Sequence, residues 1–183
     1  MHERESASAT GRRFLRSWCR RRRLVVQRVS PSASLDLEET LVYASYNPLT
    51  EPNLKRWLDN FLNKQPSFRV STRERRPVPK AARCAGCGSE VAACPQCGAP
   101  YARTPEKGVD TAIVTDLLSL AWQGAFDVAI LLSSDADHIP AVERVQEKGL
   151  KVINATWVNH GFDLAKTAWA SFSLDAVVDQ LLR

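Results

Sequence analysis

The segment FDVAILLSSDADH, Phe126 to His138, joins a near-continuous apolar run to a polar turn that contains two aspartates. The apolar part, which ends at Leu132, has the length and composition of a buried parallel strand. In an open parallel sheet, sites form outside the carboxyl ends of strands, which is where Asp135 and Asp137 should emerge. The segment therefore predicts both an α/β fold and the position of its site.

The surrounding sequence alternates between helix and strand patterns, which is typical of parallel strands joined by right-handed crossovers. We therefore expect an α/β fold with a doubly wound, mostly parallel sheet. The expected elements are helices at about Val109 to Gln123 and Ile139 to Lys148, a strand at Lys151 to Thr156, and a final helical region at Leu164 to Phe172 and Leu174 to Leu182.

The preceding part of the chain predicts a strand, a helix and a second strand. Leu41 to Tyr46 suits a buried strand, and Phe68 to Thr72 is a weaker candidate. Between them, the apolar residues of Asn53 to Lys64 follow the spacing of one helical face. Residues 35–39, which follow Ser34, have the pattern of a helix start.

The positive charge of the chain is concentrated at its start. The 183 residues have a formal net charge of +5 and are 44% hydrophobic, enough for one domain with a core and a small insertion. Residues 1–30 hold nine arginines against two glutamates, so the rest of the chain carries about −2. We therefore divide the chain into an Arg/Ser-rich extension, residues 1–34, and a domain, residues 35–183. The extension could be an RNA-binding arm, a transit-like peptide or a poorly packed segment, and Leu24 to Val29 could form a short strand within it.

The sequence contains no membrane-spanning segment and no secretory signal. No run of eighteen apolar residues is present, and the N-terminus lacks an apolar centre with a small-residue cleavage site. We therefore expect a cytoplasmic protein that does not bind a membrane and whose five cysteines stay reduced.

Four of the cysteines form two CxxC pairs, each followed by a glycine and separated by six residues. Such turns can place four thiolates around one zinc ion, which predicts a structural zinc module inserted at residues 81–101. A redox dithiol or free cysteines are the alternatives. Basic residues beside the module could hold single-stranded RNA or form a solvated linker. The predicted zinc ligands are Cys84, Cys87, Cys94 and Cys97.

The two aspartates of the polar turn predict a divalent cation. Magnesium prefers oxygen ligands, and Asp110, in the first turn of the preceding predicted helix, is a candidate third ligand. The alternative is that Asp135, Asp137 and Asp110 cap or begin helices. His138 could touch a substrate or lie partly exposed in the first turn.

Three motifs resemble the NYN family of PIN-like nucleases, in the branch with a cysteine insertion. They are Glu106 to Asp110 (EKGVD), Phe126 to Pro140, and Gly149 to Val152 (GLKV). The family reads much like KGVD, D-aliphatic-SGDSDF-P and GKKV at these places, and the resemblance covers about Leu41 to Thr156.

The resemblance implies a doubly wound sheet whose acidic pocket binds magnesium or manganese and cleaves RNA. By motif position, Asp110, Asp135 and Asp137 correspond to metal ligands, and Ser133 lines the same pocket. Hydrolysis would use water and form no covalent intermediate. RNA is the implied partner, and a homo-oligomer or a protein partner is left open.

The chain departs from the family pattern at three places. Ser134 stands where the family usually has glycine, and His138 where it usually has an aromatic residue. The family's first strand normally ends in an aspartate, but Leu24 to Ser34 contains none, and Asp36 lies in a helix-like segment. Besides an active ribonuclease, a weak or inactive module that binds RNA or protein is therefore a second hypothesis. A phosphatase is a third, although that chemistry usually places its DxD motif after the first strand.

Overall fold

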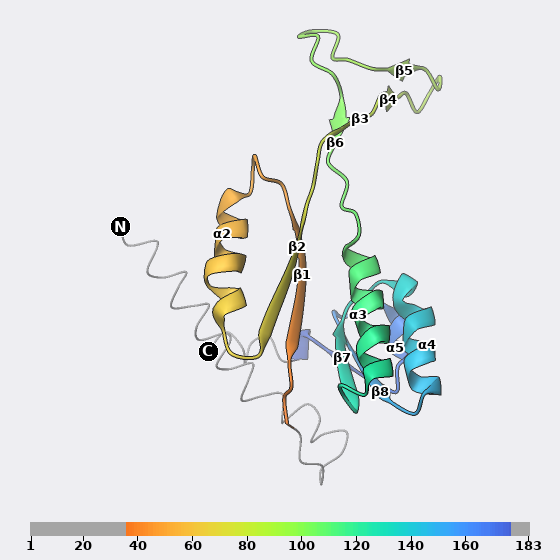
Figure 1. The fold of residues 1–183 in the computed structure, drawn as a ribbon. Helices are drawn as coiled ribbons and strands as arrows, with labels where there is room; N and C mark the ends of the chain where they lie inside the picture. Colours follow the sequence, from red (N-terminus) through yellow and green to blue (C-terminus); the bar gives the residue numbers. More distant parts are fainter. Residues whose placement is uncertain (1–35, 177–183) are drawn as a thin grey trace. The chain divides into compact units, whose positions relative to one another are not determined.

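The computed structural model describes residues 36–176. Its contacts divide the chain into two compact units, one of residues 38–113 and one that contains residues 114–176. Parallel strands alternate with helices in both, and a small insertion carries the paired cysteines (Figure 1). This is the mixed α/β architecture that the sequence predicts. Within residues 36–176, no helix is long and apolar enough to cross a bilayer.

The first unit is built on one pair of parallel strands. β1 (Thr40–Tyr46) pairs with β2 (Phe68–Glu74), and α2 (Pro52–Asn60) and the 3-10 helix η1 (Leu62–Lys64) connect them. The helical residues Leu58 and Leu62 are buried, as the spacing of the predicted helix indicates. The expected helix start at residues 36–39 is wrong, because these residues carry no regular structure and β1 begins directly after them.

The cysteine insertion grows from a short antiparallel stem. β3 (Val78–Pro79) pairs with β6 (Ala102–Arg103), and between them β4 (Ala82–Arg83) pairs with β5 (Glu90–Val91). All four strands are exposed. Figure 1 shows the insertion as a thin arm of strands and turns without a helix. Such a segment has almost no core of its own.

The second unit contains a three-stranded parallel sheet in the order β7-β8-β9. Its central strand is buried almost throughout, because α4 and α5 both pack on it. α3 crosses the boundary from the first unit into the second. The elements are α3 (Val109–Gln123), β7 (Val128–Leu132), the 3-10 helix η2 (Ala136–His138), α4 (Ile139–Glu147), β8 (Lys151–Thr156), α5 (Phe162–Thr167) and β9 (Ala170–Ser173).

The end of the described chain differs from the predicted final helix. α5 ends at Thr167, and residues 170–173 form a strand instead of continuing a helix to residue 172. Gln146 of α4 holds the turn between them, because its side-chain amide donates to the Thr167 carbonyl at 3.0 Å and accepts from the Trp169 amide at 2.6 Å. Pairing with the edge of β8 therefore overrides the helical pattern. The region predicted as Leu174 to Leu182 lies mostly outside the described residues.

Candidate active site

An acidic turn, residues 133–138, follows the carboxyl end of β7. Asp135 begins η2, and its Oδ1 accepts a hydrogen bond of 2.9 Å from the Asp137 amide. The Asp135 amide in turn donates to the Ser133 hydroxyl at 3.1 Å. These two bonds bring the three predicted site residues of the turn into one short, ordered segment.

Both aspartates of the acidic turn are exposed. Asp135 does cap η2, as the alternative hypothesis supposes, but capping uses only one of its two carboxylate oxygens. The other oxygen of Asp135 and the carboxylate of Asp137 have no further partner among the described residues. Capping and cation binding are thus compatible here. Carboxylate oxygens are hard donors of the kind that magnesium prefers.

His138 forms the inner wall of the acidic turn. It is only 1% exposed, so the expectation of a partly exposed histidine is wrong. Its Nδ1 lies 3.2 Å from the Asp135 carbonyl oxygen and 3.4 Å from the Ser133 hydroxyl, and its buried Nε2 has no partner among the described residues. The family's aromatic residue at this position was the available signal for a buried ring.

A buried asparagine that the sequence reasoning missed supports the same turn. Asn154 of β8 is fully buried, and its side-chain amide donates to the Leu131 carbonyl at 3.2 Å and to the Ser133 carbonyl at 2.9 Å. It therefore ties the central strand to the point where β7 enters the acidic turn. The available signal was one amide side chain in the middle of the apolar run of β8.

The end of β8 and the loop that follows it also contact the acidic turn. Ser134 and Thr156 share a hydrogen bond of 2.6 Å between their hydroxyl groups. Gly161 has a left-handed φ of +63°, and a Cβ atom there would lie 2.7 Å from the Ser134 Cα. Because backbone cannot yield at that distance, only glycine fits this position. The glycine that the family usually carries at position 134 is thus replaced by a serine with its own partner.

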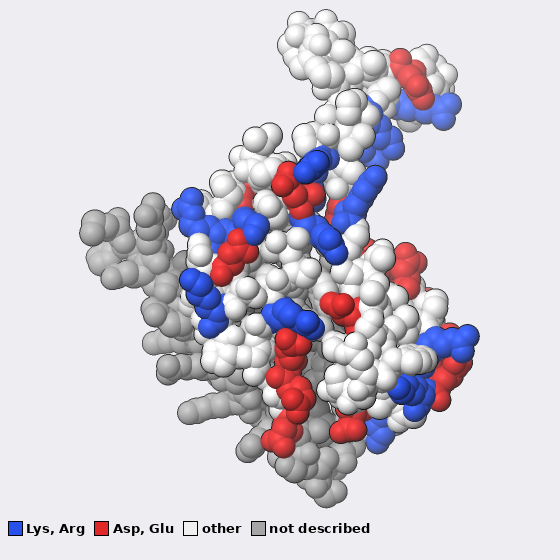
Figure 2. All heavy atoms as spheres, viewed as in Figure 1, with Lys and Arg blue, Asp and Glu red and all other residues white. Residues whose placement is uncertain are grey.

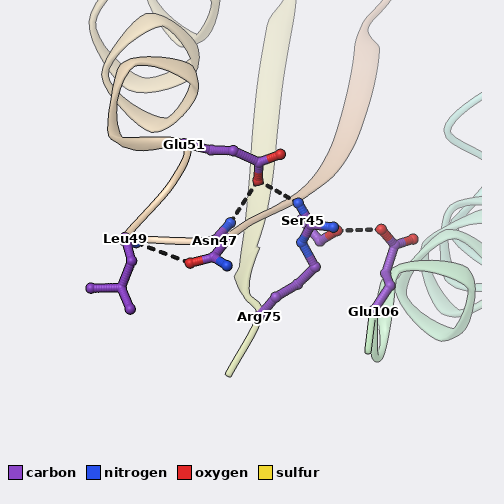
Figure 3. Close-up of polar contacts among 6 residues, drawn as sticks. All are labelled: Ser45, Asn47, Leu49, Glu51, Arg75 and Glu106. Atoms are coloured by element: carbon purple, nitrogen blue, oxygen red, sulfur yellow. Dashed lines mark hydrogen bonds and ion pairs between the residues drawn. The ribbon is translucent and has the colours of Figure 1, made fainter. Parts of the chain in front are cut away.

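Asp110 lies exposed in the first turn of α3, as predicted, and belongs to the first unit. The segment before it is anchored to the end of β1, because the Ser45 hydroxyl donates to the Glu106 carboxylate (Figure 3). Within residues 36–176, no group of three or more His, Cys, Asp or Glu side chains is arranged to hold a metal ion. The three-aspartate site therefore stays a prediction, with two of its members in the acidic turn.

A second polar cluster fixes the turn after β1. Figure 3 shows the Glu51 carboxylate between the Arg75 guanidinium, with which it forms an ion pair, and the Asn47 amide, which donates to it at 2.7 Å. The Asn47 hydrogen bond, followed by Arg75, lowers the pKa of Glu51. The ion pair and the hydrogen bonds of the cluster order this turn.

The two CxxC segments form turns of the same design. In each, the first cysteine carbonyl accepts from the following glycine amide at 2.9 Å: Cys84 from Gly88, and Cys94 from Gly98. Both glycines have positive φ values. This backbone suits thiolate ligands, and in each turn one cysteine contributes to lowering the pKa of the other. The two pairs do not converge into one four-thiol group.

One thiol in each CxxC turn has a lowered pKa. Hydrogen bonds between Cys87 and Ser89 are the largest cause that lowers the pKa of Cys87 to about 7, and Cys84 adds to the effect. The Cys97 amide is the largest cause that lowers the pKa of Cys94. Because zinc binds thiolates, these shifts reduce the cost of deprotonating the ligands. The donor chemistry therefore fits zinc.

Basic residues occur along the segment that leads from β2 to the cysteines. Figure 2 shows basic side chains there, interspersed with acidic ones rather than gathered into a patch of one sign. Arg76, for example, pairs with Glu74 at 3.5 Å. The predicted strand at residues 24–29, the Arg-rich extension and the segment without the first-strand aspartate all lie outside the described residues.

One comparison with known proteins gives a match. The family model described as "NYN domain" matches residues 42–169. Searches of curated proteins and of solved structures gave no match. The family match spans well over half of the chain, both units, and all three motifs that carry the resemblance.

Proposed function

The chain belongs to the NYN domain family, a family of PIN-like ribonucleases, and we propose that it is a metal-dependent ribonuclease that hydrolyses RNA phosphodiester bonds. One observation carries the proposal: two exposed carboxylates, Asp135 and Asp137, lie in an ordered turn at the carboxyl end of a parallel strand. This is the edge at which α/β proteins bind ligands.

In this proposal Asp110, Asp135 and Asp137 hold a magnesium or manganese ion, and Ser133 contributes to the same site. The chemistry such an ion supplies when bound is activation of water and neutralisation of phosphate charge. The chain's own residues keep the ligands in place: the Ser133 hydroxyl accepts from the Asp135 amide, and His138 and Asn154 hold the turn from inside. Hydrolysis by water requires no nucleophilic side chain.

The proposal includes a structural zinc ion at the cysteine insertion. Two equivalent turns, paired thiols and lowered thiol pKa values support it. Four thiolates fill the coordination sphere of zinc, so this site would leave no position for a substrate or water. The ion would draw the two turns together and stabilise an insertion that lacks a core. The ligands would be Cys84, Cys87, Cys94 and Cys97.

A non-catalytic RNA- or protein-binding module is the second candidate function. The sequence between Leu24 and Ser34 offers no aspartate where the family's first strand ends in one. One carboxylate fewer weakens the attraction for a divalent cation. The binding-module hypothesis therefore predicts a folded protein that retains RNA or another partner but does not cleave RNA.

Cleavage of labelled single-stranded RNA in magnesium or manganese separates the two candidates. The wild-type chain is compared with Asp135→Asn and Asp137→Asn, which keep the side-chain shape and remove one charge. Asp127→Asn is the matched control, because Asp127 is an exposed carboxylate just before the opposite end of β7. We expect at least a 100-fold loss of cleavage in the first two variants and wild-type cleavage in the control.

The opposite result is equally informative. If the folded, zinc-loaded wild-type chain does not cleave RNA in either metal, the ribonuclease proposal is wrong and the binding module is favoured. If Asp135→Asn and Asp137→Asn cleave as fast as Asp127→Asn, an activity is present but the acidic turn does not provide it.

A further inference from the structure

An exposed aromatic loop, residues 157–162, lies beside the acidic turn. It joins β8 to α5 and carries Trp157, which is 46% exposed, and Phe162, which is 76% exposed. Leaving large rings in water forgoes the stabilisation that their burial would provide. Single exposed apolar residues are common in proteins, so the case for a function rests on where these rings lie and how they are held.

The aromatic loop is ordered by hydrogen bonds at both ends. The Thr156 hydroxyl donates to the His160 carbonyl at 3.1 Å, and the His160 amide donates to the Trp157 carbonyl at 3.1 Å. The Val158 amide donates to the Asp175 carboxylate at 2.7 Å. The backbone that carries the rings is therefore already ordered, which reduces the entropy that a ligand would have to overcome.

The same loop is attached directly to the acidic turn. Gly161, which precedes Phe162, packs against the Ser134 backbone so closely that a Cβ atom has no space. The Ser134 hydroxyl bonds that of Thr156, which precedes Trp157. α5, which begins with Phe162, also packs against η2 of the acidic turn. Trp157 and Phe162 are therefore the sequence neighbours of Thr156 and Gly161, the two residues through which the loop contacts the acidic turn.

Charge near the acidic turn disfavours direct contact with phosphates. Asp135 and Asp137 are exposed, and so is Asp163, the residue after Phe162. Their negative charges repel a polyanion unless a cation lies between the carboxylates and the phosphates. RNA affinity at this edge must then come from the cation and from uncharged groups. Aromatic rings fulfil that need, because bases stack on them regardless of sequence.

We propose that Trp157 and Phe162 form a base-stacking platform that binds the unpaired bases of an RNA strand next to the acidic turn. The bases of a strand whose backbone lies at the acidic turn stack on these rings, whereas paired bases of a duplex are not available. The inference rests on the proposed ribonuclease function and adds two RNA-binding residues to it.

Two tryptophans that contact lysines near the amino-terminal end of β8 provide matched controls. Trp122 and Trp169 are also exposed, but a lysine ammonium covers each ring: Lys148 at 5.1 Å and Lys151 at 4.2 Å from the ring centroids. These lysines lie just before and at the start of β8, opposite its acidic-turn end. Among the described residues, no cation of this kind covers Trp157 or Phe162. Trp122→Ala thus removes an exposed ring without touching the platform.

The test measures binding by fluorescence anisotropy, separately from cleavage. Labelled oligouridine, the same oligomer without bases, and an RNA duplex are titrated with the full chain in magnesium at low temperature, and a gel checks that the RNA stays intact. We expect Trp157→Ala and Phe162→Ala each to weaken oligouridine binding roughly five- to 100-fold. Binding of the base-free oligomer should not change. Trp157→Phe and Phe162→Tyr should restore most of the affinity, and Trp122→Ala should bind like wild type.

The other possible outcomes test the base-stacking platform separately from the ribonuclease activity. Ring-dependent binding without cleavage would support the platform and reject the ribonuclease. Cleavage whose KM is unchanged in the alanine variants would support the ribonuclease and reject the platform. Equal affinity for duplex, or no RNA binding, also rejects it. If the variants instead alter the molecular mass in sedimentation, the rings form a protein contact and the inference is wrong.

Discussion

The β7–β9 sheet and the cysteine insertion are organised by different forces. In the sheet, Val152, Ile153 and Ala155 of the central strand are fully buried beneath helices that bury Val142 and Leu164. In the insertion, the strands are two residues long and exposed, and the order comes from backbone hydrogen bonds within the CxxC turns. The sheet is thus stabilised by apolar burial, whereas the insertion is suited to stabilisation by a metal ion. Damage to one should leave the other largely intact.

The largest expected effect is a cavity in the sheet unit. Leu164 is fully buried in α5, and Leu164→Ala should lower the free energy of unfolding by about 2–5 kcal/mol. Val91 of the insertion is 41% exposed, so Val91→Ala should change it by less than about 0.5 kcal/mol. Urea denaturation measures both. Equal effects would contradict the contrast between the two regions.

The next largest effect concerns the buried amide beneath the acidic turn. Asn154→Ala removes both hydrogen bonds to the end of β7 and leaves the Ser133 and Leu131 carbonyls without this donor. We expect a loss of about 1–3 kcal/mol in urea denaturation and slower RNA cleavage. Asn63→Ala in the first unit, whose side chain accepts from the Val70 amide at an exposed site, is the control and should have a smaller effect on both. An Asn154→Ala variant with wild-type stability would show that the amide is dispensable.

Loss of zinc should affect the insertion alone. Cys84→Ser should reduce the bound zinc, measured by plasma emission spectroscopy, from about one ion per chain to none. Limited proteolysis should then cut within residues 81–101, while the urea midpoint of the sheet unit stays unchanged. Ser89→Ala leaves all four thiols and should retain the ion. Unchanged zinc content in Cys84→Ser would overturn the zinc proposal.

The smallest expected effect is the pH dependence of the metal-free insertion. The pKa of Cys87 falls from 9.0 to about 7 in the folded chain, so the fold favours its thiolate. This contribution is fully present above pH 9 and disappears as the pH falls through about 7. Alkylation of Cys87, followed by mass spectrometry, should reach half of its maximal rate near pH 7. Ser89→Ala should move that midpoint upward, and an unchanged midpoint would show that Ser89 is not the cause.

Local sequence patterns predicted the elements whose environment is uniform. α3 and β8 have the predicted bounds, because a long helical pattern and a compact buried run each leave little choice. β9 was missed because two long-range contacts stabilise it. It pairs with β8, and the Gln146 side chain accepts a hydrogen bond from the amide of Trp169, 23 residues later in the sequence. Sequence spacing shows neither contact.

The candidate site was predictable in the same uneven way. Asp135 and Asp137 follow a strand end, and general topology predicts where they emerge. The burial of His138 and the support from Asn154 and Gly161 depend on neighbouring elements that only the folded chain brings together.

The antiparallel stem of the insertion has a consequence for protein engineering. β3 and β6 pair Val78 with Arg103 and Pro79 with Ala102, so the chain leaves and returns at nearly the same point. A two- to four-residue turn could therefore replace residues 80–101 without stretching the chain. The same stem offers a place to graft a reporter or an affinity module, or to exchange this cysteine segment for another.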